Sequence, residues 1–203
     1  MKSRKEHWEK VYDLKQPHEV SWTQEVPNTS LEFLKSFQLP KSASIIDVGG
    51  GDSKFVDYLL SEGFVNITVL DISEKAILKS ISRLGDKAAK VKWIVSDITE
   101  FKHESKYDCW HDRATFHFLI TKKEIDKYLN IAKTAISQYM IIGTFSENGP
   151  DKCSMLKVHQ YSEPELEEQL SAGFEKIKCI TEDHVTPFHT TQNFLFCSFK
   201  RTL

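Results

Sequence analysis

The chain has 203 residues and 40% hydrophobic content, which suits one domain with a substantial core better than two small domains. Its 27 basic and 29 acidic residues are spread along the sequence for a net charge of −2, so the basic surface that nucleic-acid binding requires is not expected. The first ten residues are charged and no apolar run is long enough to cross a bilayer, so we expect a cytoplasmic protein without a membrane partner.

The first 40 residues predict two short helices, over 6–12 and 30–37. Between them lies a segment at 17–27 that contains Pro and Trp and that we interpret as an ordered loop or lid. Residues 1–40 are therefore expected to be a helical lid segment of the same single domain, which spans 1–203.

Beyond residue 40, short apolar runs alternate with longer amphipathic segments, which is typical of βαβ units. Runs rich in β-branched or aromatic residues predict strands at 43–48, 67–70, 91–95, 107–110 and 138–144. Helix-like segments separate them at 53–61, 73–84 and 123–137. This order predicts an α/β fold with a mostly parallel sheet covered by helices.

The last third of the chain has a different character. A helix-like segment at 162–171 is followed by strand-like segments at 174–180 and 193–200. The connection between these two strands is too short for a crossover helix, so they should pair antiparallel.

The most informative stretch, at 45–53, reads IIDVGGGDS: an apolar strand that runs into three glycines and then opens a helix. Such a turn lets the backbone approach a ligand closely, and the free N–H groups of the helix can bind a polar group. The dinucleotide fingerprint requires a third glycine where Lys54 stands, after Gly49 and Gly51. Asp47, two residues before the first glycine, instead suits a cofactor with a positively charged amino-acid tail, so the turn favours S-adenosylmethionine.

Two further carboxylates end the next two predicted strands, in Asp71-Ile72 and Asp97-Ile98. From the carboxyl edge of the sheet, Asp71 can accept hydrogen bonds from ribose hydroxyls, and Asp97 can accept from an adenine amino group. Each acid alone could equally cap a helix, but three strand-end acids in succession predict an adenosine-type ligand. We include Ile72 and Ile98 in the same predicted cofactor site.

The residues resemble the class I S-adenosylmethionine-dependent methyltransferases, including a bacterial subgroup of unassigned substrate. Asp47, Gly49, Gly50 and Gly51 match the family's glycine motif, and the two later acids match its ribose and adenine residues. The resemblance implies a Rossmann-like, doubly wound, seven-stranded sheet that ends in an antiparallel hairpin. It implies a cofactor-binding core at 41–145 and a substrate-side part with the hairpin at 146–203.

In the resembled family, the transferable methyl lies at the end of the fourth strand. That position implies His111 and Asp112 as candidate catalytic residues, and it adds His111 and Arg113 to the cofactor site. His117 reads more simply as a buried aromatic-like residue. Trp22 could form an aromatic wall over the cofactor or could simply pack in the core.

The leading hypothesis is an enzyme that methylates a small molecule or a protein side chain. A non-catalytic S-adenosylmethionine-binding sensor or scaffold remains open, and an NAD-dependent oxidoreductase is less favoured. The fourth strand lacks the Asn/Asp-Pro-Pro-Tyr sequence of amino-methylating nucleic-acid enzymes, which again argues against a nucleic-acid acceptor.

The four cysteines, at 109, 153, 179 and 197, are far apart and form no metal-ligand spacing. We therefore expect reduced thiols, with neither a disulfide nor a bound metal.

Overall fold

A computed structural model describes residues 3–202, and its centre is a seven-stranded sheet in the order β3-β2-β1-β4-β5-β9-β8. The strands are β1 (Ser44–Val48), β2 (Asn66–Asp71), β3 (Val91–Val95), β4 (Tyr107–Arg113), β5 (Ile136–Phe145), β8 (Phe174–Val185) and β9 (Thr191–Arg201). The first five pair in parallel, and β9 pairs antiparallel with both β5 and β8. The expected mostly parallel sheet with an antiparallel terminal hairpin is confirmed.

The helices lie close to their predicted positions: α1 (Arg4–Leu14), α2 (Asn28–Ser36), α3 (Phe55–Ser61), α4 (Glu74–Leu84), α5 (Lys122–Ala135) and α6 (Glu163–Leu170). Several begin where a hydroxyl side chain accepts from the first turn, as Ser73 does from the N–H of Ala76 and Thr121 from that of Glu124. Short 3₁₀ turns add η1 (Pro17–Glu19), η2 (Gly85–Lys90), η3 (Ile98–Glu100) and η4 (Phe116–Phe118).

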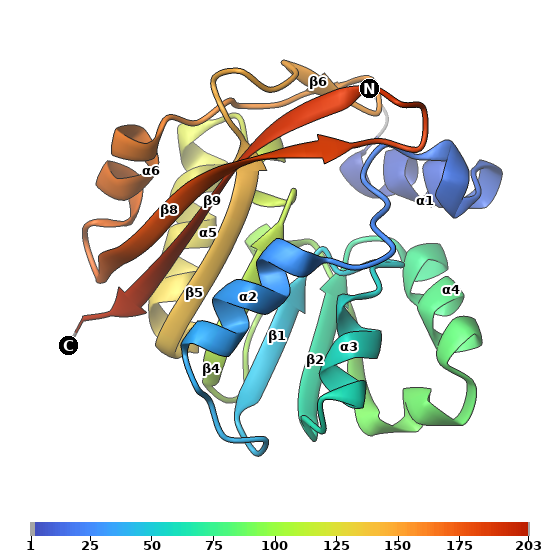
Figure 1. The fold of residues 1–203 in the computed structure, drawn as a ribbon, viewed down its shortest axis with the longest axis horizontal. Helices are drawn as coiled ribbons and strands as arrows, with labels where there is room; N and C mark the ends of the chain where they lie inside the picture. The colour runs from blue at the N-terminus through green and yellow to red at the C-terminus, as the bar shows by residue number, and fades with distance from the viewer. Residues whose placement is uncertain (1–2, 203) are drawn as a thin grey trace.

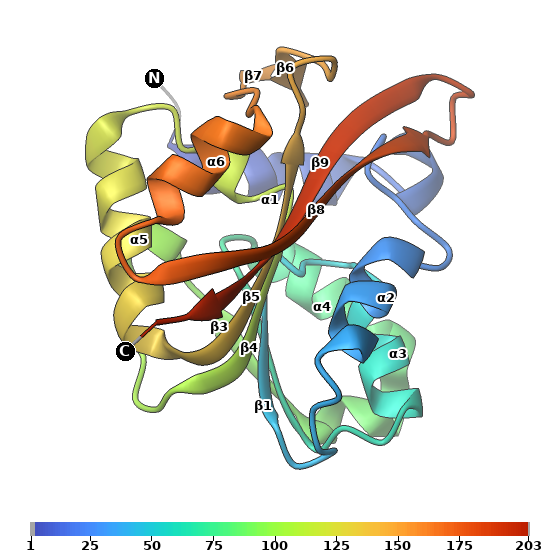
Figure 2. The same ribbon diagram turned by 60° about the vertical axis from the view of Figure 1, so that its left-hand side comes forward.

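Alternation along the strands builds a separate core on each face of the sheet. Ile46, Trp110 and Ile142 face α5 and α6, whereas Ile45, Cys109 and Ile141 face α2 and α3. Figure 2 shows the sheet nearly edge-on, with α5 and α6 on one side and α2, α3 and α4 on the other. The central strands β1 and β4 are therefore buried on both faces, as their continuous apolar runs predict.

The β8–β9 hairpin is longer than predicted and carries a disulfide. Pairing continues as far as Val185↔Thr191, so β8 extends five residues beyond its expected end. Cys179 and Cys197 are directly opposite each other in this register and are bonded through their sulfur atoms. The expectation of four reduced thiols was wrong for this pair, because cross-strand register brings together two cysteines that are distant in sequence. Cys109 and Cys153 are free and buried.

Helix α1 lies above the carboxyl ends of β1 and β2 (Figure 1) and is fastened to α4. The carboxylate of Glu9 accepts from the backbone N–H groups of Glu74 and Lys75 and from the Ser73 hydroxyl. An anion at these free donors stabilises the start of α4. Helix α1 is thus anchored to α4 by a helix-capping contact.

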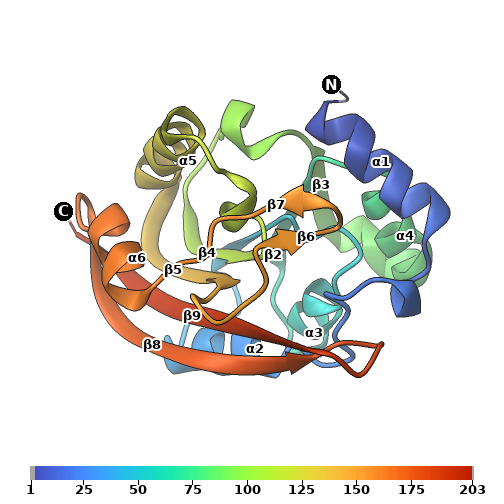
Figure 3. The ribbon, with the colours of Figure 1, turned by 90° about the horizontal axis from the view of Figure 1, so that it is seen from above.

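A short hairpin that was not predicted, β6 (Lys152–Cys153) with β7 (Leu156–Lys157), lies at the same end of the molecule as α1 (Figure 3). Within residues 3–202, no helix has the length and apolar character needed to span a membrane. In the same residues, no cluster of three or more His, Cys, Asp or Glu side chains could hold a metal ion.

Candidate active site

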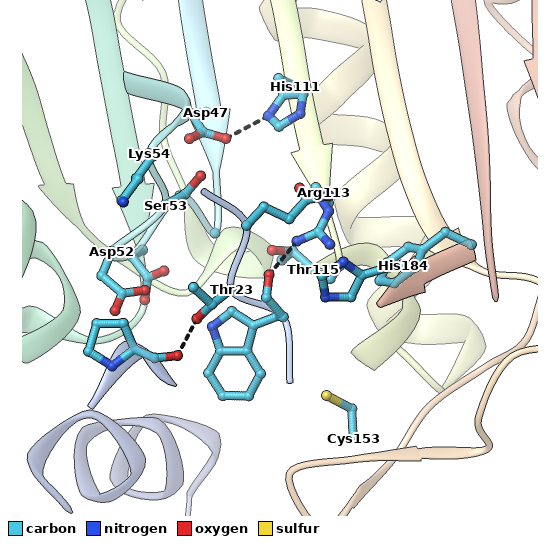
Figure 4. Close-up of a pocket in the computed structure, with 18 of the residues that line it drawn as sticks. Thr23, Asp47, Asp52, Ser53, Lys54, His111, Arg113, Thr115, Cys153 and His184 are labelled. Carbon is cyan, nitrogen blue, oxygen red and sulfur yellow. Dashed lines mark hydrogen bonds and ion pairs between the residues drawn. The ribbon is translucent and has the colours of Figure 1, made fainter. Parts of the chain in front are cut away.

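A cavity of about 1040 Å³ opens at the carboxyl edge of the parallel strands. Its lining comes from the strand ends of β1, β2 and β4, from α1 and the loop after it, and from the β8–β9 hairpin. Figure 4 shows labelled side chains from β1, β4, β8 and the loop after α1 arranged around it. This edge is where open α/β sheets bind ligands.

The glycine turn packs against other parts of the protein as well as lining the cavity. A Cβ atom on Gly49, whose φ is +68°, would lie 1.7 Å from Oγ1 of Thr115. A Cβ atom on Gly50 would lie 2.5 Å from Oδ2 of Asp47 and would cover that oxygen. Gly49 is therefore required by the fold itself, and Gly50 lets the turn lie close to the Asp47 carboxylate.

Helix α4 holds the turn from behind. The Ser80 hydroxyl donates to the carbonyl of Gly51, and the Arg83 guanidinium donates to the carbonyls of Asp52 and Ser53. Arg83 also forms an ion pair with Asp57 of α3, at 2.8 Å. The role of Arg83 was not predicted from the sequence, because it depends on how α3 and α4 pack.

Asp47 and His111, from adjacent strands, form a buried chain of hydrogen bonds. His111 Nδ1 is 2.7 Å from Asp47 Oδ1, and His111 Nε2 is 2.8 Å from the Ser30 hydroxyl of α2. The carboxylate can only accept, so Nδ1 carries the proton of this hydrogen bond, while the Ser30 hydroxyl can serve Nε2 as donor or acceptor. Both ring nitrogens are thus engaged. The second Asp47 oxygen is buried and has no hydrogen-bond partner in the described part of the chain.

Asp71 lines the cavity at the end of β2 and is almost completely buried. Its Oδ1 accepts from the backbone N–H of Ser73 at 2.7 Å. Burial raises the pKa of the Asp71 carboxyl to about 7, with smaller contributions from the charges of Asp52 and Asp47. The N-cap of α4 is Ser73, so Asp71 supports the start of that helix without being its cap residue.

Asp97 also lines the cavity, and its side chain already has protein partners. Oδ1 accepts from the backbone N–H and the hydroxyl of Thr99, so Asp97 caps η3. Oδ2 forms an ion pair with Arg4 at 3.5 Å. The capping alternative left open for Asp97 therefore describes its local contacts. The two isoleucines predicted beside the acids, Ile72 and Ile98, also line the cavity.

The expectation that Asp112 contacts the acceptor requires correction. Asp112 is fully buried and is not among the residues that line the cavity. Oδ1 accepts from the backbone N–H groups of Thr115 and Phe116, and Oδ2 accepts from the Tyr128 hydroxyl. One oxygen therefore shapes the turn after β4 and the other binds α5. Burial raises the pKa of this carboxyl to about 6. His117 is likewise buried, and burial lowers its pKa to about 3.

Arg113 projects from the end of β4 into the cavity (Figure 4). One terminal nitrogen, Nη1, donates to the backbone carbonyl of Trp22, and the guanidinium carbon lies 4.8 Å from the ring centroid of Phe194. Nε and Nη2 are buried without a hydrogen-bond partner among residues 3–202. Burial lowers the pKa of Arg113 to about 10, so the side chain stays charged at neutral pH.

The N-terminal segment contributes aromatic rings to the cavity. The Trp22 ring lies edge-on to Trp8 and Tyr12 of α1, and Trp8 also contacts Phe118. All four residues line the cavity.

The β8 part of the site lies on a strand that is longer than predicted. Glu182 and His184 were placed beyond the expected end of this strand, whereas the structure puts both within it and at the cavity wall. His184 Nε2 donates to the carbonyl of Ser21, which fixes the ring, and burial lowers the pKa of this His. Side chains along 181–184 alternate between exposed and more buried positions, as they do in a strand. The sequence did not indicate a strand there, because Glu and Asp have low β propensity.

Both the sequence and the fold of this chain are similar to those of known methyltransferases. Residues 45–138 match a family model described as a methyltransferase domain. Among curated proteins, EEF1A lysine methyltransferase 2 of Homo sapiens is 24% identical over 186 residues, which cover 86% of this chain and 75% of the human protein. Malonyl-[acyl-carrier protein] O-methyltransferase 2 of Ilyobacter polytropus is 31% identical over 88 residues, 43% of this chain and 34% of that protein.

Among solved structures, an S-adenosylmethionine-dependent methyltransferase from Anabaena variabilis superposes with a TM-score of 0.76 at 14% identity, over 100% of this chain and 96% of that one. The 1,6-didemethyltoxoflavin-N1-methyltransferase of Burkholderia thailandensis gives a TM-score of 0.69 at 19% identity, over 95% and 81% of the two chains. These likenesses establish the fold.

Proposed function

Because this chain is a class I S-adenosylmethionine-dependent methyltransferase, we propose that it methylates a small-molecule or protein side-chain acceptor that enters between Trp22 and the β8–β9 hairpin. One observation supports the proposed site most directly. At the cavity beside the glycine turn, a buried carboxylate oxygen of Asp47 has no partner within the described residues, and a side chain on Gly50 would collide with it.

The residues at this end of the cavity fit the cofactor. The free oxygen of Asp47 can accept from the ammonium of the cofactor's amino-acid tail, and Asp71 can accept from the ribose hydroxyls. Ile72 and Ile98 supply apolar surface for the adenine, and Asp97 can accept from its amino group in addition to its cap and ion-pair contacts. Cofactor contact through Gly49, Gly50 and the ring of Trp22 completes the proposed set, whereas Gly51, also expected in the cofactor site, does not line the cavity.

When bound, S-adenosylmethionine supplies a methyl group that its sulfonium already activates. The protein therefore has to bind and orient both reactants and keep water out. We assign His111 a positioning role, since its two ring nitrogens hold Asp47 and Ser30. The aromatic cluster of Trp8, Tyr12 and Trp22 covers the cavity and excludes water from it.

Binding measurements followed by label transfer test this function. S-adenosylhomocysteine should raise the melting temperature, NAD should not, and Asp47→Asn should weaken the S-adenosylhomocysteine shift. With a labelled methyl donor, a cell extract should acquire label in its protein or its small-molecule fraction. Stabilisation by NAD alone would overturn the assignment, and binding without any label transfer would favour the sensor alternative. The proposal keeps the cytoplasmic location expected from the sequence.

A further inference from the structure

Arg113 presents a particular edge of its guanidinium to the cavity. Nη1 donates to the Trp22 carbonyl and the guanidinium carbon lies over the Phe194 ring, so the nitrogens without a partner among the described residues are Nε and Nη2. Nε and Nη2 are the pair whose N–H bonds run parallel, the arrangement that binds both oxygens of a carboxylate. A single backbone carbonyl could not satisfy both.

The register of the hairpin puts an acid on the same wall. Glu182 is directly opposite Phe194 in the β8–β9 pairing, so the two side chains leave the sheet on the same face, and His184 follows two residues later on that face. Oε2 of Glu182 is buried and has no partner within residues 3–202. Phe194 therefore contacts the guanidinium of Arg113 through its ring and is paired in the sheet with Glu182.

Although both charges face one cavity, no ion pair joins Arg113 to Glu182 within the part of the chain that the structure describes. A buried donor or acceptor without a partner costs roughly 1–3 kcal/mol, and more when the group is charged. Two such charged groups on the wall of one cavity remain unpaired only if the fold keeps them beyond the distance of an ion pair. A ligand with charges of opposite sign at its two ends would satisfy both.

We propose that Arg113, which the family resemblance assigned to the cofactor site, instead forms with Glu182 the acceptor subsite for a free amino acid, with the amino acid's carboxylate on the Nε and Nη2 edge of Arg113 and its cationic nitrogen at Glu182. This inference rests on the proposed methyltransferase function and names the acceptor class for it. The cofactor tail is also dipolar, but its ammonium has its own acceptor in Asp47. Glu182 opposes the burial-induced lowering of the Arg113 pKa more strongly than Asp47 does, so the guanidinium belongs electrostatically to the hairpin side.

The test is a melting-temperature screen of the protein saturated with S-adenosylhomocysteine, with each standard amino acid and its carboxamide as probes. At least one amino acid should raise the melting temperature, and its carboxamide, which lacks the carboxylate, should not. Arg113→Lys keeps the charge and removes the two-pronged edge, and Glu182→Gln keeps the shape and removes the charge. Each should weaken amino-acid affinity by about tenfold or more and leave S-adenosylhomocysteine affinity within about twofold.

Three results would overturn the subsite. They are no shift from any standard amino acid, an equal shift from the carboxamide, and a large loss of S-adenosylhomocysteine affinity in Arg113→Lys, which would assign this edge to the cofactor's carboxylate. Glu182 is partly exposed and Gln has the same shape as Glu, so Glu182→Gln should fold normally. This variant therefore remains informative if Arg113→Lys is poorly folded. Failure of the wild-type protein to bind S-adenosylhomocysteine would instead reject the proposed function.

Discussion

His111 and Asp47 are joined by a 2.7 Å hydrogen bond between neighbouring strands, and neither side chain is exposed to solvent by more than a few per cent. The imidazole thereby fixes which oxygen of Asp47 points to the cavity. Its distance from bulk water keeps this bond strong, because the local dielectric is low.

Substitutions of His111 should separate its two hydrogen bonds. An Asn amide nitrogen can take the place of Nδ1 and keep the bond to Asp47, whereas a Gln amide nitrogen reaches the position of Nε2 near Ser30. We expect His111→Asn to retain S-adenosylhomocysteine affinity and His111→Gln to lose about tenfold, as measured by calorimetry. Equal affinities in two folded variants would show that Asp47 needs no positioning.

Asp71→Ala should weaken S-adenosylhomocysteine affinity by about one to two powers of ten, because hydrogen bonds to a charged group contribute roughly 1.5–3 kcal/mol. Asp71→Asn should have a smaller effect, since an amide oxygen still accepts from one hydroxyl. A purely structural role, through the bond to the Ser73 N–H, predicts lower apo stability with unchanged affinity. Calorimetry and apo melting curves on the same two variants distinguish these outcomes.

The pKa of about 7 for Asp71 makes cofactor binding depend on pH. Only the ionised carboxylate accepts from both ribose hydroxyls, so S-adenosylhomocysteine affinity should rise as pH increases from about 6 to about 8. Asp71→Asn should flatten this profile. A wild-type profile that is already flat would place the pKa of Asp71 outside this range.

The same shift has the opposite effect on the stability of the ligand-free protein. An aspartate whose folded-state pKa is raised from 3.8 to about 7 binds an extra proton in the folded state across that window. Its contribution to the free energy of unfolding therefore falls as pH rises from about 4 to about 7. Denaturant unfolding of wild type and Asp71→Asn should show a smaller loss with pH in the variant.

Tyr128→Phe tests whether Asp112 is structural. The Tyr128 hydroxyl accepts from Trp110 Nε1 at 2.9 Å and donates to Asp112 Oδ2 at 2.7 Å, so its removal leaves two buried groups unpaired. We expect a loss of roughly 2 kcal/mol or more in unfolding free energy and little change in S-adenosylhomocysteine affinity. A large loss of affinity with unchanged stability would return Asp112 to the binding machinery.

Non-reducing mass spectrometry of purified protein should show the loss of two hydrogens for the pair Cys179 and Cys197. Reduction should lower the melting temperature by several degrees, because closing a loop of this size restricts the unfolded chain. Cys179→Ser should remove the response to reductant, and Cys153→Ser should keep it. The same melting temperature with and without reductant would mean that the bond contributes nothing to stability.

The sequence predicted those parts of the molecule whose signals are local. The apolar runs before Asp47 and Asp71 and the glycines between them indicated the strands, the turn and the edge at which the cavity opens. Arg83, Glu182 and the partners of Asp112 were not predictable in this way. The role of Arg83 depends on which helix packs on the turn, and that of Glu182 on cross-strand register. The role of Asp112 depends on the nearby N–H groups that already donate to its carboxylate.

The bond between Cys179 and Cys197 also has a geometric effect, since it fixes which residues of β8 and β9 are opposite each other. A slip of one residue would move Glu182 to the opposite face from Phe194, and the wall would lose its charge. Insertion of a single residue between Cys179 and Glu182 should therefore abolish acceptor recognition even where the hairpin still forms. Changes in length within the connection at 186–190 leave the pairing intact, so chains with longer or shorter tips can keep the same acceptor.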